Sequence, residues 1–488
     1  MSKQIRTLSF IIAVCVIILQ LFYNSSAQNL QANIKLESIE PPILRVEGKF
    51  SETGTSKNWT FLNSYAGTQN LGERISDFSL VDKNGAKVAV KKLISGEYLA
   101  EDFATSFTYK IDLSRKEKIS SMAHISWISD KNGLIFLDDL LPQFGKNVSA
   151  KINFDLPKNL QIVGNEKLSA KNSFEVVDVE KAVFYVGESW REKEIGNLKL
   201  LISGEWQFSE TEAVEAASEI LSEYRKIFGE IPNSKAQVFV LKFPAGTPHG
   251  NWEAETRGTN VVILSSDMPF KNQSIQRLHE QFRHEFFHFW MPNNLALSGN
   301  YDWFYEGFAL YQSLRTGVEL NRLRFEDFLD TLTRAYNLDS FQSQRKSLIE
   351  ISKNRWSGAN SQVYARGMLV AFLCDLTILR ESKGKKSLTD VLREIYQKHQ
   401  KPNKEIDGNE AVINILETRR ELKIIVEKYI KGAENIAWQT DLEAFGIESI
   451  EQNSFTKLSV KTKLSGRQKD LLDKLGYNNW RKLVQKSK

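Results

Sequence analysis

Three of the chain's six histidines fall in one short stretch, and two of them, His284 and His288, bracket a glutamate in the pattern H-E-x-x-H. Residues four apart on a helix lie on one face, so both imidazoles can point at a common position. Zinc favours imidazole nitrogen at about 2.0–2.1 Å. Glu285, one position round the helix, could take a proton from a water held by such an ion. The stretch therefore predicts a zinc-binding helix.

A third ligand is expected from the segment YDWFYEGFALY (301–311), where Glu306 follows His288 by eighteen positions (306 − 288 = 18). A charged side chain inside an apolar run needs a partner, and a metal ion is the best one available. Pro292, Asn293, Asn294 and Gly299 supply a turn before this second helix. His284, His288 and Glu306 are thus the predicted ligands of one Zn²⁺ per chain. His279 and His249 are the weaker candidates for a catalytic part.

HEFFH followed by WFYEGFALY resembles the gluzincin metallopeptidases, in particular the glycyl aminopeptidase family and the related aminopeptidase N family. In both families the glutamate of Glu-Gly-Phe is the third zinc ligand. The segment beginning VYARGMLVAF (363–392) is similar to one in which a tyrosine precedes a long helix, and this resemblance implies that Tyr364 donates a hydrogen bond to the oxyanion. A softer likeness runs on to LEAFGIESI, so the resemblance covers about residues 200–450.

The chain departs from these families at two places. The aminopeptidase N families carry a G-x-M-E-N-like strand whose glutamate binds the free amine of the substrate, whereas this chain has NWEAETRGTNVV. Glu255 is the best match to that glutamate, and Glu253 is its rival. The resemblance implies that Glu255, Arg257 and Gly258 bind substrate. Only 38 residues follow Ile450 (488 − 450), too few for the PDZ domain that usually ends a glycyl aminopeptidase.

The order of the elements predicts an α+β multidomain chain. Alternating runs with turn signals at the two DKNG segments (82–85 and 130–133) indicate a β-sandwich-like domain. Ser209 and Glu212 form a capping box ahead of a helix. AQVFVLKF (236–243) and TRGTNVVIL (256–264) read as strands, and the second is expected to bind an extended substrate along its edge. The predicted domains are a β-sandwich-like domain at 28–200, a thermolysin-like zinc catalytic domain at 201–318, an α-helical domain carrying Tyr364 at 319–450, and a basic tail at 451–488.

Residues 1–27 have the three parts of a secretory signal peptide: Lys3 and Arg6, an apolar run from Leu8 to Tyr23, and small residues ending at Ala27. A retained N-terminal anchor is the alternative. We expect export to the periplasm, the cell surface or the medium, with no other stretch able to span a membrane. Cys374 would be the one cysteine of the mature chain, and its apolar surroundings predict a buried packing role.

The composition of the chain limits the kinds of binding partner that we expect. A net charge of +5 over 488 residues argues against a nucleic-acid surface, and the expected substrates are peptides or proteins. The motifs predict an exported zinc aminopeptidase, or an endopeptidase with the same centre if Glu255 does not capture an amine. An inactive zinc-retaining scaffold that binds peptides or surface components is the alternative from another class, and a hydrolase of some non-peptide bond is a third. Nothing in the sequence indicates the oligomeric state.

Overall fold

The computed structural model describes residues 30–51, 57–114, 121–129, 131–143, 148–232, 235–244, 246–453 and 455–481. The predicted signal peptide lies outside these residues. The chain forms two compact units, the smaller from Met1–Glu117 with Ile125–Glu188 and the larger from Lys118–His124 with Ser189–Lys488. The predicted boundary after residue 200 falls inside a strand of the larger unit, because residues 191–202 pair with each other and with the five-stranded sheet of that unit.

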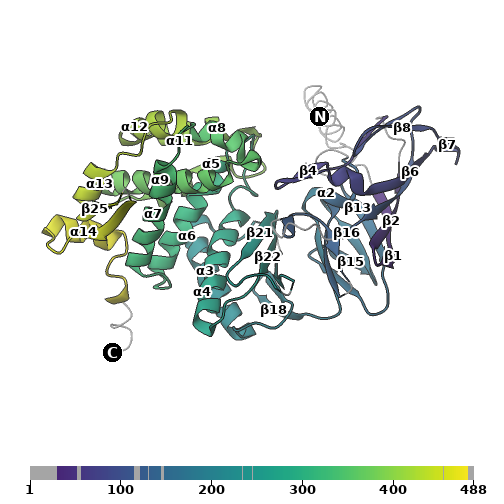
Figure 1. The fold of residues 1–488 in the computed structure, drawn as a ribbon, viewed down its shortest axis with the longest axis horizontal. Helices are drawn as coiled ribbons and strands as arrows, with labels where there is room; N and C mark the ends of the chain where they lie inside the picture. The colour runs from purple at the N-terminus through teal and green to yellow at the C-terminus, as the bar shows by residue number, and fades with distance from the viewer. Residues whose placement is uncertain are drawn as a thin grey trace, which may run out of the picture. The chain divides into compact units, whose positions relative to one another are not determined.

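The smaller unit is the predicted β-sandwich-like domain (Figure 1). Its two main sheets share one core, in which Phe154 and Phe184 from opposite sheets lie 5.1 Å apart between ring centroids. In sheet order, the eight-stranded sheet contains β15 (Lys167–Ala170), β16 (Ser173–Val176), β13 (Ala150–Asp155), β1 (Leu30–Ile39), β2 (Pro42–Phe50), β10 (Ser106–Asp112), β6 (Ile75–Val81) and β7 (Lys87–Val88). The four-stranded sheet contains β11 (Trp127–Ile128), β12 (Asn132–Phe136), β17 (Val183–Gly187) and β14 (Gln161–Gly164).

The smaller elements described in this unit are a sheet of β3 (Asn58–Thr60), β9 (Glu97–Ala100) and β8 (Val90–Ile94), the pair β4 (Ser64–Tyr65) and β5 (Thr68–Gln69), the short helix α2 (Leu137–Leu140), and the 3₁₀ helices η1 (Leu71–Arg74) and η3 (Val179–Lys181). The first DKNG segment makes the predicted hairpin, since Leu80 pairs with Val88 and Gly85 takes the positive φ of +83° that the turn needs. At the second DKNG, β11 and β12 pair on either side of Asp130, which lies outside the described residues.

The larger unit is built on a five-stranded sheet in the order β18 (Arg191–Ile195), β19 (Leu198–Ile202), β20 (Ala236–Lys242), β22 (Asn260–Ser265) and β21 (Trp252–Arg257). β19, β20 and β22 run parallel, and the apolar runs of β20 and β22 are buried on both faces, as parallel strands usually are. The helix α3 (Glu210–Phe228) connects β19 to β20. It begins with the predicted capping box of Ser209 and Glu212 and ends at Gly229.

The prediction of one strand over 256–264 was wrong. Gly258, with φ +60°, and Thr259 make a tight turn that splits this stretch into the hairpin β21–β22. β22 lies between β20 and β21, so its backbone is already paired on both sides and cannot bind a substrate strand. β21 occupies the sheet edge instead.

The remaining elements form a helical layer around one continuous core (Figure 1). They are α4 (Lys271–Glu285), the 3₁₀ helix η4 (Phe286–Phe289), α5 (Asp302–Tyr305), α6 (Gly307–Glu319), α7 (Phe325–Ser340), α8 (Leu348–Lys353), the 3₁₀ turn η5 (Arg355–Ser357), α9 (Asn360–Glu381), α10 (Leu388–His399), α11 (Gly408–Glu417), α12 (Lys423–Ile425) with the π-helical turn Val426–Lys431, and α13 (Gln439–Ala444). The short strands β23 (Leu297–Ser298) and β24 (Ile406–Asp407) pair in parallel.

The segment predicted as a basic tail is largely folded. β25 (Ile447–Gln452) and β26 (Phe455–Val460) form a hairpin, and α14 (Gly466–Lys474) follows with a Ser465 capping box. Leu471, Leu472 and Leu475 are buried in the core of the larger unit. These apolar contacts attach the segment to the helical layer.

From the sequence we expected only the N-terminal segment to be able to span a membrane. By length and composition, α9 is also long and apolar enough to do so. In the folded unit 89% of its most apolar window is buried. The helix contains Cys374, which is buried as predicted. α9 is therefore the central helix of this unit's core, and it carries Tyr364 at its first turn.

Two glycines bring α9 against α6. A Cβ atom on Gly307 would lie 2.5 Å from the Cα of Gly367, and one on Gly367 would lie 2.6 Å from the carbonyl oxygen of Trp303. These distances leave no room for a side chain at either position. Gly307 directly follows Glu306 and Gly367 lies about one helical turn after Tyr364, so this close crossing helps to set the distance between Glu306 and Tyr364.

Candidate metal centre

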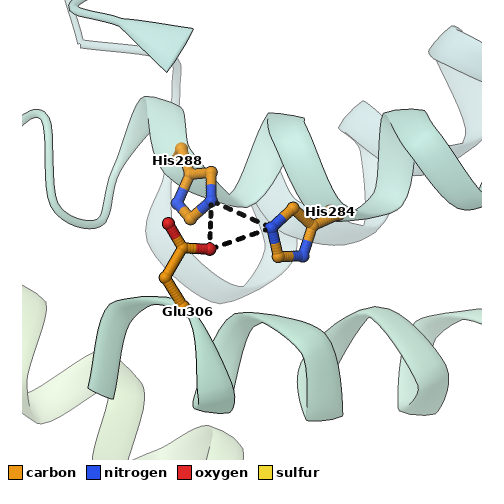
Figure 2. A group of neighbouring side chains, drawn as sticks. All are labelled: His284, His288 and Glu306. Carbon is orange, nitrogen blue, oxygen red and sulfur yellow. Dashed lines mark hydrogen bonds and ion pairs between the residues drawn. The ribbon is translucent and has the colours of Figure 1, made fainter. Parts of the chain in front are cut away.

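His284 and His288 lie where an α-helix tightens into a 3₁₀ helix. α4 ends at Glu285 and η4 continues directly, with Glu285 and Phe286 both in the right-handed helical region. The H-E-x-x-H pattern therefore stays on one continuous helical segment, although the sequence predicted a uniform helix. Glu306 occupies the single residue between α5 and α6, and its side chain reaches back toward the two histidines (Figure 2).

The three ligand atoms form a compact triangle (Figure 2). His284 Nε2 lies 3.2 Å from Glu306 Oε2 and 3.3 Å from His288 Nε2, and the third side, from His288 Nε2 to Glu306 Oε2, is 3.6 Å. Ligands at about 2.0–2.1 Å from a tetrahedral zinc ion lie about 3.3 Å from one another. The side chains present thus fit this ion in number, type and spacing, with a fourth corner left for another ligand.

The tautomer of His288 suits metal binding. Its Nδ1 lies 2.8 Å from the carbonyl oxygen of Met291, which can only accept, so Nδ1 carries the proton and Nε2 keeps its lone pair in the neutral ring. Burial lowers the pKa of His288, but the hydrogen bond and charge of Glu306 outweigh burial and raise it to about 9. The negative charge of Glu306 therefore favours a cation beside His288, either a proton or a metal ion.

Glu306 is buried and ionised. Burial acts to raise its pKa, but the nearby charge of Arg355 and the hydrogen bonds of His284 and His288 hold the pKa well below its usual value. Arg355 Nη1 forms an ion pair with Glu306 Oε1 at 3.0 Å, so the two carboxylate oxygens have different partners. Oε2 is the one that faces the histidines.

Glu285 is buried beside the triangle and is held by the edge strand. Thr256 Oγ1 donates to Glu285 Oε2 at 2.7 Å. Asn293 links the same two elements, since its amide donates to the carbonyl oxygens of Thr256 at 3.3 Å and His288 at 3.0 Å. The hydrogen bond from Thr256 thus holds Oε2 of Glu285, and Asn293 joins β21 to η4.

Tyr364 lies on the other side of the triangle, at the start of α9. Its ring centroid is 6.1 Å from that of His284, and Arg355 Nη2 donates to its phenolic oxygen at 3.0 Å. Burial raises the pKa of Tyr364 well above its usual value, and the charge of Glu306 adds to this. The phenol therefore keeps its proton and can act as a hydrogen-bond donor.

The structure places the three predicted substrate-binding residues at the end of β21. The carboxylate of Glu255 lies 2.5 Å from His124 Nδ1 and 3.3 Å from Arg257 Nε. Arg257 is buried and also donates to the carbonyl oxygen of His124 at 3.1 Å. Gly258 is the turn residue of the β21–β22 hairpin. His124 belongs to the larger unit, and its ring contacts Trp356, 6.1 Å away between centroids.

Glu253 lies on the same face of β21, two residues before Glu255. Its Oε2 is 3.8 Å from His124 Nε2, beyond hydrogen-bonding distance. Burial raises the pKa of Glu253 to about 7, although the charge of His124 opposes this. A cationic group placed here would find two carboxylates on adjacent positions of one strand face.

His279 is not part of the triangle. Its Nε2 lies 2.7 Å from Glu219 and its Nδ1 lies 2.6 Å from Arg283, so it joins α3 to α4 in a buried network. Arg355, Thr256, Asn293 and His124 were not predicted from the sequence. Each is a single polar residue, and only the folded chain brings Arg355, Thr256 and Asn293 to the predicted ligand segments and His124 to Glu255.

Comparisons with known proteins were made by sequence and by structure. No protein-family model and no curated protein sequence matches the chain. Solved structures do match the chain. An aminopeptidase N family protein from Idiomarina loihiensis superposes with a TM-score of 0.74 at 15% identity, covering 90% of this chain and 82% of the other. The chain has the aminopeptidase N fold.

Two further structures support this fold. The M1 zinc metallopeptidase from Deinococcus radiodurans, solved as a mutant bound to the substrate Tyr-Ser-Ala, matches with a TM-score of 0.55 at 13% identity, covering 84% of this chain and 94% of the other. Yeast LTA4 hydrolase in complex with bestatin matches with a TM-score of 0.53 at 12% identity, covering 84% and 68%. The α+β multidomain fold predicted from the sequence is thereby confirmed.

Proposed function

We propose that this chain is an exported zinc-dependent metallopeptidase that removes residues from the N-termini of peptides. The observation that carries the proposal is the triangle of His284, His288 and Glu306, whose ligand atoms have the spacing of a tetrahedral zinc site. It is supported by the fold, since the solved structures it resembles include zinc metallopeptidases.

A zinc ion held by these three side chains supplies Lewis acidity, which lowers the pKa of water towards about 7 and polarises a carbonyl oxygen. Glu285 acts as the general base: it accepts the proton of the attacking water and then donates it to the amine nitrogen that leaves. The hydrogen bond from Thr256 holds one carboxylate oxygen of Glu285 and so orients the other. Tyr364 keeps its proton and donates a hydrogen bond to the oxyanion that develops on the former carbonyl oxygen.

β21 is positioned to bind the peptide chain. It is an edge strand, so its outer backbone groups can pair with an extended substrate, and Thr256 on this strand contacts Glu285 directly. Glu255 and Glu253 lie farther along the same strand and offer negative charge for a free α-amine. This arrangement favours an aminopeptidase, in line with the tripeptide bound to the Deinococcus radiodurans structure.

The test compares pairs of peptides that differ only in an N-acetyl group. We expect cleavage of the first bond in the free-amine peptides and at least a hundredfold slower cleavage of the blocked ones. Equal cleavage of both would instead establish an endopeptidase with the same centre. The Glu285→Gln protein is the control: zinc content should match wild type while hydrolysis is lost. Absence of hydrolysis by zinc-loaded wild type would leave the peptide-binding scaffold as the function.

Export is proposed from residues 1–27 alone. The protein expressed in a host with a secretory pathway should be recovered outside the cytoplasm, and N-terminal sequencing should find a start at Gln28. Recovery of the full-length chain in the cytoplasm would contradict export. Recovery in the membrane fraction with residues 1–27 intact would show that the segment is an anchor.

A further inference from the structure

Arg355 connects two parts of the candidate centre that lie on different helices. It belongs to the 3₁₀ turn η5, between α8 and α9, and its side chain is 10% exposed. One nitrogen, Nη1, forms an ion pair with Glu306 Oε1 at 3.0 Å, and the other, Nη2, donates a hydrogen bond to the phenolic oxygen of Tyr364 at 3.0 Å. A single planar guanidinium therefore joins a predicted zinc ligand to the predicted oxyanion donor.

The rest of its surroundings hold the guanidinium in place. Nη1 also lies 3.0 Å from Asp302 Oδ1, and Nε donates to Asn360 Oδ1 at 3.0 Å. Its Cζ atom lies 4.4 Å from the ring centroid of Trp356, within the range of a cation–π contact. Burying a charge is unfavourable unless it is paired and hydrogen-bonded, and here two carboxylates satisfy that need. Because the fork of donors is rigid, Arg355 has one orientation, and both of its functional partners must conform to it.

For Glu306 the consequence concerns which oxygen faces the metal position. Oε1 is engaged by Arg355, which leaves Oε2 toward His284 and His288 at 3.2 and 3.6 Å. Without Arg355 the carboxylate could rotate or present both oxygens. Partners that orient a ligating carboxylate in this way commonly change metal affinity by about 10–100-fold when they are removed.

For Tyr364 the consequence concerns the direction of its proton. A phenolic oxygen has one proton and accepts hydrogen bonds through its lone pairs. Arg355 can only donate, so it uses a lone pair of Tyr364 and cannot receive the proton. The O–H bond must therefore point away from Arg355, and the rings of Tyr364 and His284 lie 6.1 Å apart between centroids.

We propose that Arg355 is a positioning residue for the reaction: it presents a single oxygen of Glu306 to the zinc ion and orients the Tyr364 hydroxyl as a donor to the oxyanion. The inference rests on the proposed peptidase function for its second half, whereas the first half concerns zinc binding alone.

Zinc affinity tests the first half without any assay of hydrolysis. Arg355→Gln and wild type would be titrated with zinc against a fluorescent chelator of known affinity. We expect the variant to bind zinc about 10–100-fold more weakly. Arg345→Gln is the matched control, because Arg345 is another largely buried arginine that bonds to Asp339 and contacts none of the three ligands. It should keep wild-type zinc affinity.

A double-mutant cycle at saturating zinc tests the second half. Arg355→Gln should lower kcat about 10–100-fold with little change in KM, whereas the same substitution in a Tyr364→Phe background should lower it less than about threefold, because the hydroxyl that Arg355 orients is already gone. A merely structural role would reduce kcat by the same factor in both backgrounds. Arg355→Lys is a second variant in case the glutamine variant misfolds. It keeps the positive charge but not the planar fork of donors. We therefore expect its zinc affinity to lie between those of wild type and Arg355→Gln, and its kcat to be close to that of Arg355→Gln.

The outcomes separate this inference from the proposed function. Wild-type hydrolysis together with unchanged zinc affinity and unchanged kcat in Arg355→Gln and Arg355→Lys would overturn the role of Arg355 and leave the peptidase proposal standing. If zinc-loaded wild type hydrolyses no peptide, the peptidase proposal fails, and so does the claim that Arg355 orients Tyr364 toward the oxyanion. The zinc titration then still decides whether Arg355 positions Glu306.

Discussion

In the proposed mechanism proton transfer depends on Glu285, which is not among the three predicted zinc ligands. Glu285→Gln keeps the size of the side chain and its hydrogen bond to Thr256 but removes the basic oxygen. We expect kcat to fall by at least about 10²–10⁴-fold, the usual contribution of a general base. Zinc content should remain at one ion per chain. A variant that retains more than a tenth of wild-type kcat would show that another group is the base.

Tyr364 should affect the chemical step and not the binding of substrate. Replacing it with phenylalanine removes one donor to the oxyanion, for which losses of about 10²–10³-fold in kcat are typical. KM for a free-amine peptide should stay within about threefold, since the ground-state carbonyl is a poorer acceptor than the oxyanion. Steady-state kinetics measures both. A rise in KM with unchanged kcat would instead assign Tyr364 to substrate binding.

Glu253 should make stability depend on pH. Its pKa is raised to about 7 in the folded protein from an ordinary value of 4.5, so folding favours the neutral acid. The wild-type chain is then penalised as the pH rises from about 4.5 through 7. In metal-free protein, Glu253→Gln should raise the melting temperature at pH 8 and leave it unchanged at pH 4. Glu194→Gln, at an exposed position of β18, is the control and should alter neither. A stabilisation of equal size at both pH values would refute the titration of Glu253.

Some site residues could be predicted from a short stretch of sequence, and others could not. His284, Glu285 and His288 could be found from sequence because helix geometry alone fixes their relation, and Glu306 because a carboxylate amid Trp303 and Phe304 needed an explanation. Arg355 could not be found this way. It lies 49 positions after Glu306 (355 − 306 = 49) in an irregular turn, and its importance follows only from the way α5, α6 and α9 pack.

At the scale of helices and strands, the contact of α6 with α9 sets the geometry of the centre. Gly367→Ala would place a Cβ 2.9 Å from the Cα of Gly307 in α6 and 2.6 Å from the carbonyl oxygen of Trp303 in α5, so α9 must move away from both helices. We expect a loss of about 1–3 kcal/mol in the free energy of unfolding, as overpacking usually gives, and a fall in kcat because Tyr364 moves with α9. Denaturant unfolding and steady-state kinetics check the two effects.

Gly466→Ala is the control for this substitution, because a Cβ there meets open space at the start of α14. It should leave both stability and kcat essentially unchanged. Wild-type stability and activity in Gly367→Ala would mean that the helices can separate without consequence, and that their close approach does not position Tyr364.

Elements with local signals were predictable, and those decided by tertiary pairing were not. The capping box of α3, the first DKNG hairpin and the apolar strand β20 follow from short stretches of sequence. The β21–β22 turn was missed because Arg257, Gly258 and Thr259 sit in a run of β-forming residues, and Gly258 alone marks the reversal. Likewise β18 and β19 alternate like sandwich strands, and only their pairing with β20 assigns them to the larger unit.

For the molecule as a whole, zinc binding should stabilise one of the two compact units. All three predicted ligands belong to the larger unit, so chelation should lower the melting temperature of that unit only. A ligand at about 1,000 times its Kd stabilises by about 4 kcal/mol. Calorimetry of wild type with and without a chelator measures the shift, and His288→Ala should show none. A zinc-dependent shift that persists in His288→Ala would place the stabilising ion elsewhere.

The central claim is that two imidazoles and one carboxylate hold a single zinc ion. Anomalous diffraction from crystals of the zinc-loaded protein, recorded on both sides of the zinc absorption edge, tests it most directly. We predict one strong peak per chain, about 2.0–2.1 Å from His284 Nε2, His288 Nε2 and Glu306 Oε2. A map with no zinc peak between these three atoms would contradict the account.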